Sequence, residues 1–216
     1  MKQASIFLHF GVAQCMLSSF LLFSCTPATQ TSQTEVVNGY ATSAAQPWLT
    51  ELYACAADSA VVLIVNADAP DIYLRVGEPD VFVSPAYQID EEEILVVTHR
   101  ESSVQNLTLE EAQALFMRGS ASAQVWVYSS DADVQRMFDQ LVMKGRSVTS
   151  SAKVAASPQQ MSDLLNAEKD SVGILPRHWK TGTVREVFSA GFVPVLAVTK
   201  EEPQREVLDL LSCLQK

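Results

Sequence analysis

The segment VYSSDADVQRMF, residues 127–138, places hydroxyl groups and acids in a short turn between two apolar runs. This order predicts a strand, a tight turn and a helix, and the free N–H groups at such a helix start commonly bind an anion. The turn carries two acids of its own, Asp131 and Asp133. We expect Ser130 to cap the helix, Asp133 to complete a capping-box-like pair, and Asp131 to favour the helix dipole.

These acids decide which ligands the turn could accept. A phosphate bound there would lie close to Asp131 and Asp133, and like charges at about 4 Å cost several kcal/mol at a protein-like effective dielectric constant. We therefore expect no tight phosphate binding. Two interpretations stay open. The turn binds a neutral or cationic solute through Ser129, Ser130 and Asp131, or its acids only stabilise the helix.

The remaining polar candidates give little support for catalysis. His99 and His178 have neither the HxH nor the HxxxH spacing of a metal site, and no GxSxG turn is present. We expect no enzymatic activity, no metal and no cofactor. Arg100 follows an apolar strand-like run and could bind a carboxylate or another oxyanion, although such an arginine more often pairs with a surface acid.

Segments that alternate between strand and helix must position these residues. Short apolar or alternating runs predict strands, and amphipathic runs after start signals, such as Thr108 with Glu111, predict helices. This alternation indicates an α/β fold with a largely parallel sheet. The acidic run Asp90–Glu93 is most simply a solvated loop. The main predicted strands are residues 35–41, 61–65, 71–76, 94–99, 125–128, 172–175 and 192–198, with helices from Pro47, Thr108, Ser157 and about Pro203.

The first 24 residues are predicted to be an export signal, because Lys2 precedes a long apolar run without acids. The run ends LLFSC, which resembles the lipidation motif of bacterial lipoproteins with Cys25 as the modified residue. An uncleaved membrane anchor is the alternative, since about 20 apolar residues can span a bilayer. Residues 25–35 would form a lipid-anchored flexible tether. Either interpretation places the chain outside the cytoplasm, at the cell membrane.

The net charge and the cysteines add two further expectations, one about partners and one about a disulfide. The chain has 15 Lys and Arg against 25 Asp and Glu, a net charge of −10, so we expect no nucleic-acid partner. Cys55 and Cys213 both lie on apolar helical faces, and outside the cytoplasm such a pair can form a disulfide. Two buried free thiols are the alternative, because a sequence does not supply the Cα separation that a disulfide requires.

Four segments resemble, in order, the phosphate-type extracytoplasmic solute-binding proteins of ABC transporters, which have the type 2 periplasmic-binding fold. They are NGYATSAAQPW (38–48), ILVVTHRESSVQNLTLEEAQALFMRG (94–119), VYSSDADVQRMFDQLV (127–142) and KDSVGILP (169–176). The resemblance implies two lobes, residues 36–98 with 187–216 and residues 99–186. It also implies a ligand cleft between the lobes.

Carried over residue by residue, the resemblance implies a ligand contact from Thr42, with Ser43 beside it. It matches Asp71 loosely to an acidic ligand acceptor. The family's Ser-Gly-Thr turn falls on residues 132–134, ADV, and the Arg expected before it is missing. The resemblance implies a substrate-binding lipoprotein of an ABC-type transporter, with a solute other than phosphate and a membrane permease as partners. The alternative is a binding-fold lipoprotein that acts as a sensory or protein-interaction module without transport.

Overall fold

The computed structural model describes residues 35–81 and 83–216. The stretch Thr34–Lys216 forms one compact unit. The predicted export signal, Cys25 and nearly all of the tether lie outside the described residues and stay predictions. Within the described part of the chain, no helix combines the length and the apolar character needed to cross a membrane.

One eight-stranded sheet organises the described residues in the order β2-β1-β3-β8-β4-β7-β5-β6. The outer pairs are parallel, but β8 is antiparallel to both β3 and β4, and β4 is antiparallel to β7. The expectation of a largely parallel sheet is therefore wrong at its centre. The strands are β1 Val36–Ala41, β2 Val62–Val65, β3 Ile72–Val76, β4 Ala86–His99, β5 Gln124–Val127, β6 Lys153–Val154, β7 Ser171–Pro176 and β8 Val184–Thr199.

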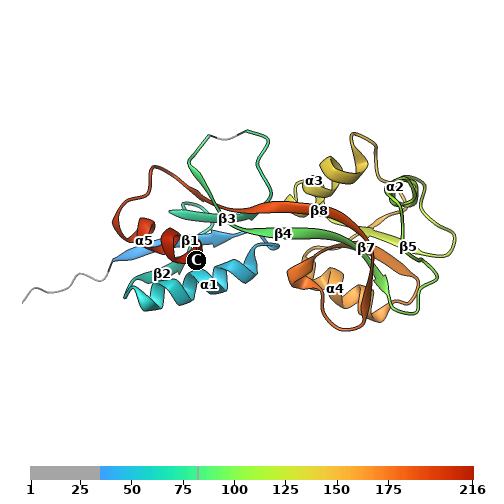
Figure 1. The fold of residues 1–216 in the computed structure, drawn as a ribbon, viewed down its shortest axis with the longest axis horizontal. Helices are drawn as coiled ribbons and strands as arrows, with labels where there is room; N and C mark the ends of the chain where they lie inside the picture. Colours follow the sequence, from blue (N-terminus) through green and yellow to red (C-terminus); the bar gives the residue numbers. More distant parts are fainter. Residues whose placement is uncertain (1–34, 82) are drawn as a thin grey trace, which may run out of the picture. The chain divides into compact units, whose positions relative to one another are not determined.

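The two longest strands, β4 and β8, run through both lobes of this unit (Figure 1). Lobe I contains β1, β2 and β3, and lobe II contains β5, β6 and β7. Between the lobes, Glu91–Glu93 pair only with Phe192–Pro194, so a two-stranded bridge connects them. The bridge consists of residues 91–93 of β4 and 192–194 of β8. The predicted lobe limits, at residues 98 and 187, therefore fall within lobe II and not at the bridge.

The bridge corrects the interpretation of the acidic run Asp90–Glu93 as a solvated loop. These residues lie within β4, where Glu92 is 1% exposed and Glu93 is 8% exposed. Their partners are far away in the sequence. His178 Nδ1 lies 2.8 Å from Glu92 Oε2, and Arg177 Nε donates to Glu93 Oε2 at 2.6 Å. The composition of the segment alone does not reveal partners so distant in the sequence. A run of four acids was therefore predicted to be exposed to solvent.

Local signals did locate helix starts where the cap lies within a few residues. Thr108 and Glu111 form the predicted capping box of α2. Ser157 accepts a hydrogen bond from the Gln160 N–H and caps α4. The helices are α1 Gln46–Asp58, α2 Leu109–Arg118, α3 Asp133–Phe138, α4 Pro158–Ala167 and α5 Arg205–Leu214, with a π-helix at Asp139–Met143 and a 3₁₀ turn at Arg177–Trp179.

Helices α1 and α5 pack against each other beside the strands of lobe I (Figure 1). Trp48 and Leu52 of α1 and Leu210 of α5 are almost completely buried. A disulfide joins Cys55 to Cys213, with their Cα atoms 5.9 Å apart and a sequence separation of 158. Closing so long a loop restricts the unfolded chain and stabilises the fold by about 2–5 kcal/mol.

Candidate functional site

The carboxylate of Asp133 lies at the junction of the two lobes. Asp133 begins α3 in lobe II, yet its Oδ2 accepts hydrogen bonds from lobe I, from the Thr42 hydroxyl at 2.5 Å and the Val76 N–H at 3.0 Å. Its Oδ1 accepts from the Val134 N–H at 2.9 Å. Asp133 is only 4% exposed. Burial of a carboxylate is tolerated here because these three donors satisfy its oxygens.

The topology explains how the donors from lobe I come together. Thr42 directly follows β1, and Val76 is the last residue of β3. β1 and β3 are parallel neighbours, so their carboxyl ends meet at the same edge of the sheet. The Thr42 N–H donates to the Leu74 carbonyl at 3.0 Å, which holds the loop after β1 in place. Open α/β sheets usually bind their ligands at such strand ends.

The predicted cap of α3 at Ser130 is wrong. Ala132 is the N-cap residue, and no side chain caps this helix. Ser130 is exposed, and the Ser129 carbonyl accepts from the Ala132 N–H at 3.0 Å. The pKa of the exposed Asp131 is lowered, first by a hydrogen bond from the Ser129 hydroxyl. Asp131 thus acts within its own turn, whereas Asp133 makes contacts across the molecule.

Two phenols and a guanidinium group lie in the electrostatic surroundings of Asp133. Burial raises the pKa of Tyr73, with an opposing effect of Arg75 and a smaller contribution from the Asp133 charge. Burial, with a contribution from Asp133, also raises the pKa of Tyr128 well above its usual value. Both phenols stay protonated at neutral pH and add no negative charge to the junction. Burial lowers the pKa of Arg75, whose Nε donates to the Gly77 carbonyl at 3.0 Å.

The lobes also touch around the Asp133 contact. A Cβ atom built on Gly77, which follows β3, would overlap the Met137 side chain of α3. The indole N–H of Trp179 in lobe II donates to the Ala44 carbonyl in lobe I at 2.9 Å. Direct packing and hydrogen bonds therefore hold the lobes in contact where the resemblance implied a ligand cleft.

The structure brings only part of the predicted site to the junction. Thr42 lies there, but the group that it contacts is Asp133 of the same chain. Ser43 is exposed beside it. Ser129, Ser130 and Asp131 are exposed in the turn before α3, and Ser130 lines a separate pocket with residues such as Gln135 and Arg146.

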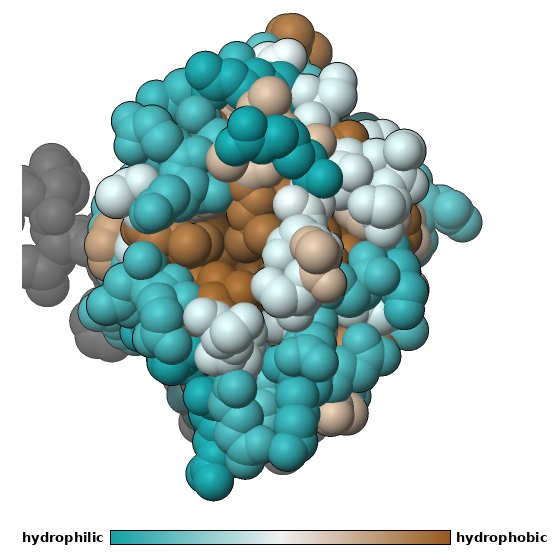
Figure 2. Space-filling view, turned by 90° about the vertical axis from the view of Figure 1, so that its right-hand side faces the viewer, coloured by the Kyte–Doolittle hydropathy of each residue, from teal (hydrophilic) through white to brown (hydrophobic). Residues whose placement is uncertain are grey.

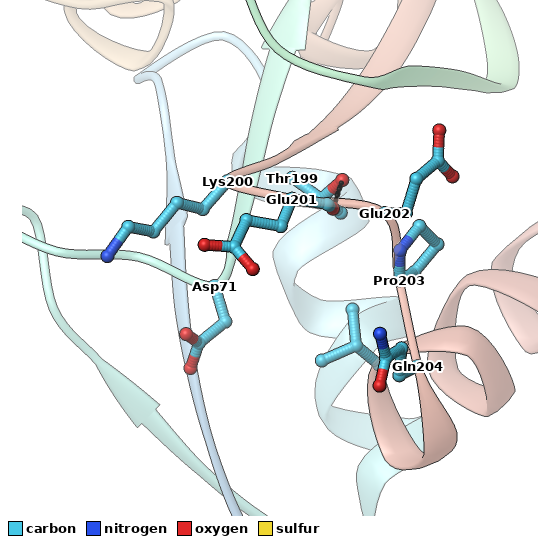
Figure 3. Close-up of a pocket in the computed structure, with 8 residues that line it drawn as sticks. Asp71, Thr199, Lys200, Glu201, Glu202, Pro203 and Gln204 are labelled. Carbon is cyan, nitrogen blue, oxygen red and sulfur yellow. Dashed lines mark hydrogen bonds between the residues drawn. The ribbon is translucent and has the colours of Figure 1, made fainter.

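Asp71 and Arg100 lie elsewhere. Asp71 precedes β3, at the end opposite Val76, and accepts hydrogen bonds from the backbone and side-chain nitrogens of Asn38 at 2.8 and 3.0 Å. It lines a pocket of about 380 Å³ between the end of β8 and the start of α5 (Figure 3). Arg100 follows β4 at the end away from the bridge, and its side chain is 64% exposed. Neither residue contributes to the junction.

The sequence analysis missed the long-range role of Asp133 and the donor at Val76. A backbone N–H carries no signal in the sequence, so Val76 could not be found in advance. For Asp133 a signal existed, because the resemblance aligned it with the family's ligand-binding turn. Within residues 35–81 and 83–216, no three His, Cys, Asp or Glu side chains are grouped so that they could hold a metal ion.

Comparison with known proteins identifies the fold. No protein-family model matches the sequence. No curated protein matches it either. A phosphate ABC transporter substrate-binding protein from Clostridium perfringens, solved with bound phosphate, is similar in structure, with a TM-score of 0.72, 15% identity, and coverage of 83% of this chain and 93% of that chain.

Two further solved structures extend the comparison. An ABC-type phosphate transport receptor from Vibrio cholerae aligns with a TM-score of 0.64, 12% identity and the same 83% and 93% coverage. The reduced regulatory domain of OxyR2 from Vibrio vulnificus aligns with a TM-score of 0.67 and 9% identity over 87% of this chain and 98% of that chain. The chain therefore has a two-lobed α/β periplasmic-binding-protein-like fold, which transport proteins and a regulatory domain both use.

Proposed function

We propose that this chain is an extracytoplasmic, membrane-anchored protein of the periplasmic-binding fold that acts as a protein-interaction or sensory module and carries no oxyanion. The observation that supports the absence of oxyanion binding is the Asp133 carboxylate, which accepts hydrogen bonds from the hydroxyl of Thr42 and the N–H groups of Val76 and Val134. A hydroxyl and two N–H groups are the kind of donors that bind an oxyanion. In this chain the anionic group that these donors bind is the side chain of Asp133, which is part of the chain itself.

A free anion would have to displace this tethered carboxylate. The covalent connection gives Asp133 a high effective concentration at the donors, which a dissolved ion must outcompete. A phosphate that entered beside the carboxylate would also add like charge in a buried environment. Both effects act against oxyanion binding while the lobes are in contact.

A second candidate is the solute-binding component of an ABC-type transporter, working with a membrane permease and a neutral or cationic solute. Similarity to two phosphate-transport proteins across 93% of their chains favours it. Transport would require the lobes to separate by flexing at the two-stranded bridge. The bonds from Thr42 and Val76 to Asp133 would then break to admit the solute.

A binding screen on the unit Thr34–Lys216 tests the proposal. Thermal stability is measured with phosphate, sulfate, amino acids and polyamines, and any hit is titrated by calorimetry. A ligand at 100 times its Kd adds about 2.7 kcal/mol and raises the melting temperature by a few degrees. We expect no shift with any member. A shift with phosphate or sulfate contradicts the proposal, whereas a shift with a neutral or cationic solute favours transport.

The matched variants are Asp133→Ser and Asp131→Ser. The first removes the tethered carboxylate from the three donors, and the second removes an exposed acid from the same turn. We expect any gain of phosphate binding to be confined to Asp133→Ser. Membrane anchoring is tested separately by lipid labelling of the full chain, which the Cys25→Ser variant should lose.

A further inference from the structure

Strand β2 forms one edge of the sheet and exposes an apolar surface. Among the described residues it pairs only with β1. Its four residues are Val-Leu-Ile-Val, with Val62 44%, Ile64 47% and Val65 52% exposed. The neighbouring Val36 of β1, which pairs with Val62, is 51% exposed. Large apolar side chains grouped at a surface often mark a contact site.

The backbone of β2 offers hydrogen bonds in a defined direction. The N–H groups of Val62 and Asn66 donate to the Glu35 and Gly39 carbonyls of the β1 segment at 2.9 and 3.0 Å. Because N–H groups alternate in direction along a strand, those of Leu63 and Val65 face away from β1. An extended segment laid beside β2 could accept hydrogen bonds from both.

The opposite edge of the sheet is protected, and β2 is not. Strand β6 has only two residues, and one of them is Lys153, whose Nζ lies 5.0 Å from the centre of the Trp126 ring. Short length and a lysine are two of the usual means by which a sheet edge avoids unwanted pairing. Strand β2 itself contains no charged residue and no proline. An edge without protection is suited to pairing with another strand.

Charge indicates what kind of segment would fit. Residues 35–74 contain β1, α1, β2 and most of β3, and they include five acids but no Lys or Arg. Glu35, Asp58 and Asp68, which are close to β2 in the sequence, are all exposed. Pairing β2 with a second copy would bring two acidic surfaces together. A segment with basic flanks would instead find opposite charge.

We propose that β2 is the docking edge for an extended apolar segment of another protein, flanked by Lys or Arg, which adds a strand to the sheet. This deepens the proposed function, because it names the surface and the class of partner. The end of lobe II also shows an apolar hollow within a hydrophilic surface (Figure 2). Nothing indicates what would cover that hollow, whereas at β2 the backbone donors and the charge define the occupant.

The probe is the synthetic peptide KKVTVTVKK, compared with EEVTVTVEE, against the unit Thr34–Lys216. Fluorescence anisotropy measures affinity, and hydrogen exchange by NMR follows the amides of Leu63 and Val65. We expect the lysine peptide to bind at least about tenfold more tightly than the glutamate peptide and to slow exchange of both amides. Equal affinities, or unchanged exchange at both amides, would overturn the proposal.

Two variants locate the contact. Val65→Pro removes an outward N–H and leaves the bonds to β1, so we expect at least about tenfold weaker peptide binding. Val154→Thr makes an apolar-to-polar change of similar shape in β6, at the opposite edge of the sheet, and we expect affinity within about threefold of the wild type. Peptide binding by Val65→Pro equal to that of the wild type, or a concentration-dependent dimer lost in that variant, overturns the proposal. Phosphate binding by the wild type would contradict only the proposed function.

Discussion

Helices α2 and α3 both begin beside an acid, yet the two acids do different work. At α2, the Thr108 hydroxyl accepts from the Glu111 N–H at 3.3 Å, and the Glu111 carboxylate accepts from the Thr108 N–H at 2.8 Å. Both hydrogen bonds join residues of the same helical turn and lie at the surface. At α3, the buried Asp133 accepts from Thr42, 91 positions away, and from Val76, 57 positions away. In both cases a carboxylate accepts hydrogen bonds. At α2 these bonds cap the helix, whereas at α3 they join the two lobes.

The difference shows what a helix start can do when other strands end beside it. At α2 the orphan N–H groups have only local side chains to satisfy them. At α3 the carboxyl ends of β1 and β3 supply further donors, so a single carboxylate can satisfy groups of both lobes. If this distinction holds, breaking long-range connections should cost much more stability than breaking local caps.

The largest loss is expected from the covalent long-range connection. The double variant Cys55→Ala with Cys213→Ala should unfold more easily by about 4 kcal/mol, because the unfolded chain regains the freedom of the long loop. Chemical denaturation under oxidising conditions measures the change. Addition of a reductant should then have no further effect on the variant. Equal stability of variant and wild type would show that the disulfide adds nothing to the packing of α1 on α5.

The next loss is expected from Asp133→Ala, at about 3 kcal/mol, because two buried N–H groups and the part-buried Thr42 hydroxyl lose their acceptor. Urea denaturation of the variant and the wild type measures it. The control is Asp131→Ala in the same turn, which is exposed and should change stability by less than about 0.5 kcal/mol. A small effect of Asp133→Ala would mean that water replaces the carboxylate at no cost.

A smaller loss, about 1 kcal/mol, is expected from Thr108→Ala, which removes a local cap. Ser157→Ala at α4 is the matched comparison, because that hydroxyl also accepts one backbone N–H, from Gln160 at 3.2 Å. Urea midpoints of the two variants should therefore agree closely. A loss at Thr108 as large as that at Asp133 would contradict the distinction between local and long-range helix starts.

The smallest effect is a pH dependence at Glu111. Its pKa is lowered, first by the hydrogen bond from the Thr108 N–H. A pKa that is lower in the folded state gives stability that is present above the unfolded value, roughly 4.3, and is lost as the pH falls through the folded value. The difference in stability between wild type and Glu111→Gln should shrink in acid. A difference that grows on acidification would exclude this assignment.

Interpretation of the sequence was most reliable where the partner lay a few residues away. It located the caps at Thr108 and Ser157 and the apolar centres of most strands, because these patterns depend on spacing along the chain. It failed at Asp90–Glu93, whose partners approach from β8 and from the turn after β7. It also proposed Asp71, from the resemblance, and Arg100, from its place after a strand, as ligand contacts, and the structure places both away from the junction.

The sequence by itself determined the α/β class, the resemblance to a two-lobed binding fold and the presence of acids at the start of α3. The α/β class follows from periodicity and element order along the chain, whereas the two-lobed fold was implied by the resemblance of four segments to a known family. Tertiary structure decided that Asp133 is a bridge between the lobes. A buried carboxylate takes whatever donors surround it, and here the pairing of β1 with β3 brought Thr42 and Val76 to the same place.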